Sequence, residues 1–183
     1  MESLAGNFLI STPQMPDPRF SEQVIYMCAH NEEGAMGVVV NNPNYEITLF
    51  DIFHGINLPI PEGPLPPVYI GGPVELDAGF ILYHAAVHER YSLEITPTIS
   101  LSRDTRLLED ISRGQGPENY LFLLGYAGWG PGQLESELID NSWLTVPADY
   151  DVLFHTPDDQ KWKKAAQTFG IDISSFGDMI GYA

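Results

Sequence analysis

Cysteine, basic side chains and long apolar runs are all scarce in this chain of 183 residues. Cys28 is the single cysteine, so no internal disulfide can form, and this favours a reducing compartment. No apolar run approaches the roughly 18 residues needed to cross a bilayer. The segment from Met1 to Ile10 lacks the basic start and the unbroken apolar stretch of a secretion signal. We therefore expect a cytoplasmic protein that does not enter a membrane.

Basic residues are heavily outnumbered, with 8 Lys and Arg against 25 Asp and Glu, for a formal net charge of −17. Such a charge repels phosphate backbones and anionic lipid surfaces, so direct binding of nucleic acid is disfavoured. The three lysines, Lys161, Lys163 and Lys164, lie together, but so small a patch neutralises only a few phosphates. We interpret them as the solvated face of a helix.

Several motifs that carry chemistry are absent as well. The chain has no G-x-S-x-G, no H-E-x-x-H and no phosphate-binding G-x-x-x-x-G-K-[ST], and a lone cysteine cannot make a Cys-x-x-Cys site. We lean towards a protein that is not an enzyme. We expect no cofactor and no metal.

What the chain does have is apolar segments separated by glycine and proline. Gly and Pro number 17 and 15, yet 44% of the residues are hydrophobic, which indicates turns rather than disorder. Residues 24–29 and 36–40 are apolar on both alternating faces, and the short link that ends in Gly34 predicts an antiparallel hairpin. Further strands are expected at residues 7–10, 68–70, 80–85, 93–101 with a break at Pro97, 120–124, 143–146 and 152–154.

Helices are expected between these strands. The clearest prediction covers residues 157–169, with Thr156 as the cap and with Trp162, Ala165, Ala166 and Phe169 on one buried face. Others are expected at residues 48–55, 104–113 and 133–140. Because strands and helices do not alternate regularly, we predict one α+β domain, residues 1–183, with a largely antiparallel mixed sheet.

Three groups of residues could carry chemistry, and each has a simpler interpretation. His84 and His88 would lie about 13 Å apart on a strand, at about 3.3 Å per residue, too far to share a metal ion. Cys28 and His30 could share one face of a strand and make contact, but an apolar neighbourhood favours an inert buried thiol. The glycines of residues 125–132 favour a tight turn under Trp129 over a phosphate site.

Two long and unusual segments are HNEEGAMG, residues 30–37, and GYAGWGPGQLE, residues 125–135, accompanied by GGPV at 71–74 and NSWL at 141–144. On these residues the chain resembles, nearly end to end, the YqgE/AlgH family of small bacterial proteins. The resemblance implies an α+β fold with a small closed β-barrel and flanking helices. It implies no catalytic residues and no cofactor, although some members are labelled transcriptional regulators.

Two functional hypotheses stay open, with a third below them. The first is a non-catalytic regulatory or interaction protein that binds a protein partner through an exposed apolar patch rimmed by acid. The second is an enzyme or small-ligand binder with a pocket between the HNEEG loop and the GYAGWGPGQ turn. The third is transcriptional regulation by direct DNA binding, which the charge opposes. The candidate binding residues are His30, Asn31, Glu32, Tyr126, Trp129, Gln133 and Glu135.

Overall fold

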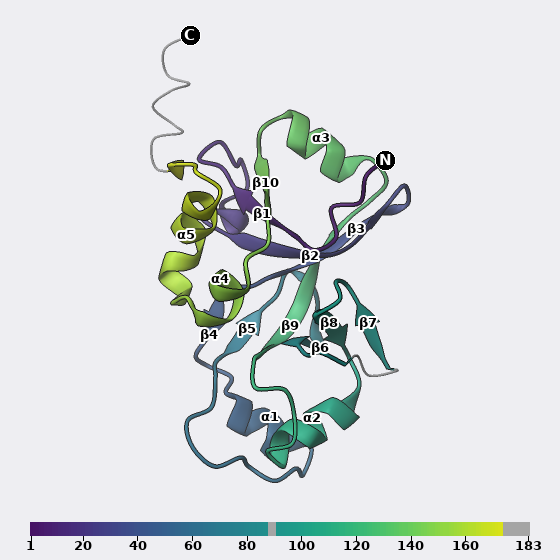
Figure 1. Ribbon diagram of the computed structural model, residues 1–183, viewed down its shortest axis with the longest axis vertical. Coiled ribbons are helices and arrows are strands. Elements are labelled where there is room, and N and C mark those ends of the chain that lie inside the picture. The colour runs from purple at the N-terminus through teal and green to yellow at the C-terminus, as the bar shows by residue number, and fades with distance from the viewer. Residues whose placement is uncertain (88–90, 174–183) are drawn as a thin grey trace. The chain divides into compact units, whose positions relative to one another are not determined.

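The strands and helices of the protein fall into two units in a computed structural model that describes residues 1–87 and 91–173 (Figure 1). The first unit contains Met1–Asn42 and the chain from Ala127 onwards, and the second contains Pro43–Tyr126. Strand β9, Tyr120–Trp129, contributes residues to both. The prediction of a single domain therefore stays a prediction, and the units are described separately.

The first unit is built on an antiparallel sheet in the order β10-β1-β2-β3, followed by the last residues of β9. Its strands are β1 (Asn7–Ser11), β2 (Val24–Asn31), β3 (Gly34–Val39) and β10 (Trp143–Pro147). The expected hairpin is confirmed, because Asn31 pairs with Gly34 across a two-residue turn. Strand β2 is buried from Val24 to Cys28, as its doubly apolar sequence predicts.

Short helices complete this unit: η1 (Pro18–Phe20), α3 (Gln133–Ile139), α4 (Tyr150–His155), η2 (Asp158–Gln160) and α5 (Lys161–Thr168). The expected helix at 157–169 is thus a 3-10 turn followed by α5. Thr156 does not cap it, because its hydroxyl donates to the Asp151 carbonyl oxygen at the end of α4. Trp162, Ala165 and Ala166 are buried as predicted. Phe169 is 55% exposed, contrary to the prediction, because the helix ends at Thr168 and Phe169 leaves its buried face.

Two local predictions in this unit are wrong. Residues 152–154 were expected to be a strand, but they lie in α4, where the Asp149 carboxylate accepts a hydrogen bond from the Val152 N–H and begins the helix. The segment 125–132 was expected to be one tight turn. Its residues up to Trp129 continue β9, and only the following glycines turn the chain, with Gly132 at φ 74° as the N-cap of α3.

The second unit has a sheet in the order β4-β5-β9-β6-β8-β7. Its strands, besides β9, are β4 (Pro43–Asn44), β5 (Val68–Ile70), β6 (Val74–His84), β7 (Ser92–Glu94) and β8 (Ile99–Ser102). Helices α1 (Leu49–Gly55) and α2 (Thr105–Ser112) pack on it through a shared core that includes Leu49, Phe53, Leu107, Ile111 and Phe122. Strand β5 runs parallel to β9, and the other pairs are antiparallel.

Two glycines allow close approaches that a side chain would block. Gly34 begins β3 at φ 142°, and an added Cβ would fall on the carbonyl oxygen of Trp129 in β9. Gly125 in β9 has φ 76°, and a Cβ there would lie 2.5 Å from the carbonyl oxygen of Gly72. Both positions therefore need glycine for backbone conformation and for space.

The predicted class, α+β with a largely antiparallel mixed sheet, is confirmed. The closed β-barrel that the resemblance implied is not shown. Among residues 1–87 and 91–173, β10 pairs only with β1, β7 only with β8 and β4 only with β5, so these strands are edges of open sheets. In the same residues no helix is long and apolar enough to cross a membrane.

Candidate functional site

His30, near the end of β2, forms hydrogen bonds through both ring nitrogens. Its Nδ1 accepts a hydrogen bond from the backbone N–H of Leu4 at 3.1 Å, and its Nε2 lies 2.7 Å from Oε1 of Glu135. Because Nδ1 is an acceptor, the ring hydrogen is on Nε2, which donates to the carboxylate. The side chain is only 3% exposed. The imidazole therefore has no free nitrogen for a substrate proton or a metal ion.

Glu135 sits in the first turn of α3 and completes this contact. The hydrogen bond from His30 is the main cause that lowers the pKa of the Glu135 carboxyl, and a bond from its own backbone N–H adds to the effect. The carboxylate stays ionised and holds the imidazole in one orientation. The pair thereby joins α3 to the end of β2.

Glu137, two residues further along α3, accepts hydrogen bonds from two tryptophans. Its Oε2 receives the indole N–H of Trp129 at 2.9 Å and that of Trp143 at 2.8 Å, and Gln133 Nε2 donates to Oε1 at 3.1 Å. The two indole rings pack edge to face with centroids 6.2 Å apart. Both tryptophans are buried, and a buried indole N–H needs an acceptor. Glu137 supplies one acceptor for both.

Glu137 is the residue that sequence reasoning missed. It lies four residues after Gln133, and that spacing on a helix places the two side chains on one face. Two nearby tryptophans with indole N–H groups to satisfy were the signal that could have identified it. Gln133 is held further, because its Oε1 accepts a hydrogen bond from the Gly130 N–H at 3.1 Å.

The structure brings most of the candidate residues together in the first unit. His30 and Glu135 are in direct contact, and Gln133 and Trp129 converge on Glu137. Asn31 and Glu32 lie at the exposed hairpin turn, where Asn31 Oδ1 accepts a hydrogen bond from the Glu33 N–H at 2.8 Å.

Tyr126 belongs to the second unit, where it packs edge to face on Phe80. It is partly buried, whereas Trp129 and Trp143 are fully buried. The two tryptophans therefore form no exposed aromatic patch. A binding role for the candidate residues stays a prediction.

Cys28 and His30 do not form a catalytic pair. The register of β2 shifts between Met27 and Ala29, and the Cys28 thiol donates to the Tyr26 carbonyl oxygen at 3.6 Å. Burial raises the pKa of Cys28 to about 12, so the thiol stays protonated. Both ring nitrogens of His30 have other partners. The expectation of a buried thiol is confirmed, and its lack of reactivity stays a prediction.

Metal ligands do not gather in the part of the chain that the structure describes. In residues 1–87 and 91–173, no group of three His, Cys, Asp or Glu side chains could hold an ion. His84 ends β6, but His88 lies outside the described residues, so the spacing of that pair is not described.

The interpretation of the three lysines as a solvated helix face is wrong for Lys161. Lys161 is 2% exposed, and its Nζ donates to the Val40 carbonyl oxygen at 2.7 Å and to Asp158 Oδ1 at 2.9 Å. Desolvation lowers the pKa of Lys161, and the attraction of Asp158 partly opposes that shift. Lys163 and Lys164 are exposed, as expected. The first lysine of the cluster therefore anchors α5 to the end of β3.

The second unit exposes apolar side chains on and around α1. These are Tyr45, Ile47, Phe50, Ile56 and Ile60, which we call the α1 surface; they are 80%, 38%, 49%, 46% and 39% exposed. They make five of the twelve exposed large hydrophobic residues found in the described part of the chain. Between residues 43 and 67 the charged side chains are Glu46, Asp51 and Glu62, with no Lys or Arg. Along the chain, the exposed apolar residues are thus interspersed with acidic residues and with no basic one.

The fold and these contacts define an α+β protein whose candidate site is an internal network joining a helix to a sheet. A family model described as AlgH-like matches residues 8–174. The chain therefore belongs to the AlgH-like family, and the expected relationship is confirmed. No catalytic function is indicated by the family or by the network.

Relatives cover almost the whole chain. A UPF0301 protein of Desulfotalea psychrophila is 51% identical over 99% of this chain and 95% of its own length, and one of Hahella chejuensis is 43% identical over 100% and 98%. The solution structure of the AlgH protein from Pseudomonas aeruginosa matches with a TM-score of 0.78 and 38% identity, covering 98% of this chain and 94% of that one. A crystal structure of a Corynebacterium diphtheriae protein, at 19% identity and a TM-score of 0.71 over 92% and 88% of the two chains, shows the same fold.

Proposed function

We propose that this protein is a non-catalytic regulatory or interaction protein that binds a basic protein partner through the α1 surface. The observation that carries this function is the concentration of exposed apolar side chains between residues 45 and 60. Exposed apolar residues scattered singly are ordinary, whereas a concentration rimmed by polar residues is typical of a protein interface. Tyr and Phe are also enriched in such interfaces.

Helix α1, which carries this surface, is anchored in the core of the second unit and capped at its N-terminus. Leu49 and Phe53 are buried in the core of the second unit, and Thr48 and Asp51 form a reciprocal capping box at the start of α1. Phe50 stacks on His54 with ring centroids 5.9 Å apart. A preorganised aromatic side chain loses little conformational entropy when a partner binds.

The negative charge of the chain favours a basic partner. The segment 43–67, which carries the α1 surface, has three acidic residues and no Lys or Arg, and the whole chain carries −17. A second copy, a nucleic acid or an anionic membrane would add like charge to like charge. A protein segment with apolar side chains flanked by Lys and Arg is complementary in both respects. If this protein regulates transcription, it does so in this proposal through such a partner and not by direct DNA contact.

The alternative, a small-ligand or catalytic pocket between the HNEEG loop and the GYAGWGPGQ turn, has less support. The two segments meet, but both ring nitrogens of His30 and both carboxylate oxygens of Glu137 bond to other groups of the protein. Groups used in this way are not available to a substrate. The compartment we propose is the cytoplasm, supported by a single cysteine in 183 residues.

Site-specific photo-crosslinking in the producing cells tests the contact surface. A photoreactive amino acid at position 45 or 50 should capture one and the same protein, whereas the same probe at Ile139, which is 80% exposed in the first unit, should not. The captured peptide should contain apolar residues beside Lys or Arg. The double variant Tyr45→Ser/Phe50→Ser should lose at least about tenfold in affinity for that protein, and Ile139→Ser less than about twofold.

Two outcomes would reject the α1 surface. One is equal capture at position 139 and at positions 45 and 50. The other is a captured protein whose purified form binds the double variant as well as it binds the unchanged chain.

A further inference from the structure

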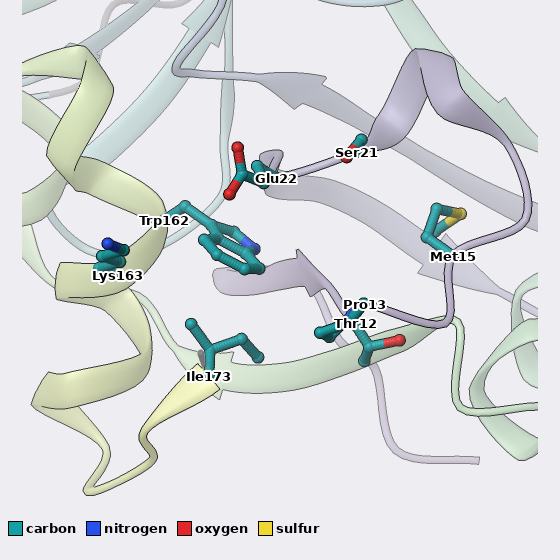
Figure 2. Close-up of a pocket in the computed structure, with 8 residues that line it drawn as sticks. All are labelled: Thr12, Pro13, Met15, Ser21, Glu22, Trp162, Lys163 and Ile173. Carbon is teal, nitrogen blue, oxygen red and sulfur yellow. The ribbon is translucent and has the colours of Figure 1, made fainter. Parts of the chain in front are cut away.

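A pocket of about 380 Å³ opens in the first unit between α5 and the segments that follow β1 and η1. Its volume lies within the range of small-molecule sites, roughly 300–1,000 Å³. The apolar part of the lining consists of Pro13, Met15, Trp162 and Ile173. Figure 2 shows the indole of Trp162 reaching from the helix into the middle of the pocket, with Met15 across from it.

The wall formed by α5 is fixed by two consecutive residues. Trp162 Nε1 donates to the Ser11 carbonyl oxygen at 2.8 Å, and the ring is 8% exposed. Lys161, the residue before it, bonds to the Val40 carbonyl oxygen. These two bonds tie the helix to the ends of β1 and β3. Lys163, which follows them, is exposed and lines the pocket.

The opposite wall carries Glu22 in an unusual backbone conformation. Glu22 has φ 52°, in the left-handed region that few non-glycine residues adopt. The side chain of Asn41 holds it there, because Nδ2 donates to the Glu22 carbonyl oxygen and Oδ1 accepts from the Val24 N–H, each at 3.0 Å. The position of the Glu22 backbone beside the pocket is thus set by the fold.

Glu22 and Lys163 therefore bring opposite charges to one pocket. In the described residues, 1–87 and 91–173, neither side chain forms an ion pair, with the other or with any third residue. A purely anionic ligand would meet Glu22 and the −17 of the chain, and a purely cationic one would meet Lys163. A ligand with one charge of each sign can pair with both walls.

We infer that this pocket binds a zwitterionic α-amino acid or dipeptide with an apolar side chain. Its ammonium group pairs with Glu22, its carboxylate pairs with Lys163, and its side chain lies on Trp162 towards Met15 and Ile173. This site goes beyond the proposed function and does not depend on it, because the α1 surface belongs to the other unit.

Titration of the full chain with L-leucine and with leucyl-leucine tests the site, by calorimetry and by NMR of the three indole N–H groups. Either ligand should shift the Trp162 signal saturably and leave those of Trp129 and Trp143, which are bonded to Glu137, in place. The tighter of the two identifies the free amino acid or the dipeptide as the ligand. N-acetyl-leucine and leucinamide, each lacking one charge, should bind at least about fivefold more weakly than L-leucine.

Two variants and one matched control test whether Glu22 and Lys163 each contribute to ligand binding. Glu22→Gln and Lys163→Gln should each weaken binding by about fivefold, a modest effect because both side chains are exposed. Lys164→Gln removes a neighbouring exposed charge outside the pocket and should change affinity by less than about twofold. The site is refuted if neither ligand shifts Trp162 up to about 20 mM, if the capped compounds bind equally well, or if Lys164→Gln weakens binding as much as Lys163→Gln.

Discussion

Replacing Glu137 with alanine should destabilise the first unit by about 2–4 kcal/mol. The substitution removes the acceptor from two buried indole N–H groups, those of Trp129 and Trp143, which lie 2.9 and 2.8 Å from Oε2. Each buried donor left without an acceptor costs about 1–3 kcal/mol. Two donors together give about 2–6 kcal/mol. We expect the lower half of that range because Glu137 is partly exposed and water can replace some of the lost contact.

Urea unfolding monitored by tryptophan fluorescence measures this loss of stability in the first unit. The three tryptophans of the chain, Trp129, Trp143 and Trp162, all belong to the first unit, so their emission reports on that unit. With a slope of about 2 kcal/mol per molar urea, the midpoint should fall by about 1–2 M. Circular dichroism at the same urea concentrations will show whether the second unit unfolds with it, which tests the single-domain prediction.

Glu137→Gln separates the hydrogen bonds from the charge. The amide oxygen can still accept from both indoles, so the variant should lose only about 1 kcal/mol. Glu33→Ala is the matched control: Glu33 lies at the exposed hairpin turn of the first unit, where no hydrogen bond or ion pair of its carboxylate occurs among the described residues, and the loss should stay below about 0.5 kcal/mol. A loss in Glu137→Ala no larger than in Glu33→Ala would refute the role of the shared acceptor.

Three further predictions follow from burial and backbone geometry. Desolvation lowers the pKa of Lys161 below its ordinary 10.5 despite the attraction of Asp158, so between the folded-state pKa and 10.5 the unfolded chain binds more protons than the folded one. The stability of the protein relative to Lys161→Met should therefore rise with pH up to about 10.5. Urea unfolding at several pH values measures this difference, and a flat or falling difference would contradict the prediction. Cys28, with its pKa raised to about 12, should react with iodoacetamide at pH 8 at least about 100-fold more slowly in the folded protein than in urea, as mass spectrometry can follow. Gly34→Ala would place a Cβ on a backbone carbonyl of β9 and should lower the free energy of unfolding by more than about 2 kcal/mol in the same urea assay. In Gly130→Ala no atom lies within 4 Å of the new Cβ, so the loss should stay below about 1 kcal/mol.

Most strands and helices could be located from the sequence because their signals are local. The doubly apolar run at β2 and β3 marks buried strands, and Thr48 and Asp104 cap α1 and α2 where the sequence placed these helices. Helix α4 was missed because three apolar residues, Val152 to Phe154, fit a short strand as well as a helix. The distinguishing signal was Asp149, three residues before Val152, in the position of a helix cap.

The contacts of the candidate site were harder to predict because they join residues far apart in the chain. The bond from Lys161 to the Val40 carbonyl oxygen spans 121 positions, and the contact of His30 with Glu135 spans 105. A lysine is rarely buried, so composition and periodicity assign it to the surface unless the partner is known. The resemblance named the segments that meet, but it could not show that His30 and Glu137 bond to other groups of the protein.

Helix α5 shows how one such long-range contact determines a surface property. Successive residues on an α-helix are about 100° apart, so Lys161, Trp162 and Lys163 point in directions that span about 200° around the helix axis. Lys161 and Trp162 are both bonded to backbone carbonyls of the sheet, and the rotation of the helix is thereby fixed with Lys163 at the pocket. Lys161→Met should then weaken leucine binding through the helix, although Lys161 does not line the pocket, and Lys164→Gln should not. An unchanged affinity in Lys161→Met would mean that Trp162 alone sets the rotation of α5.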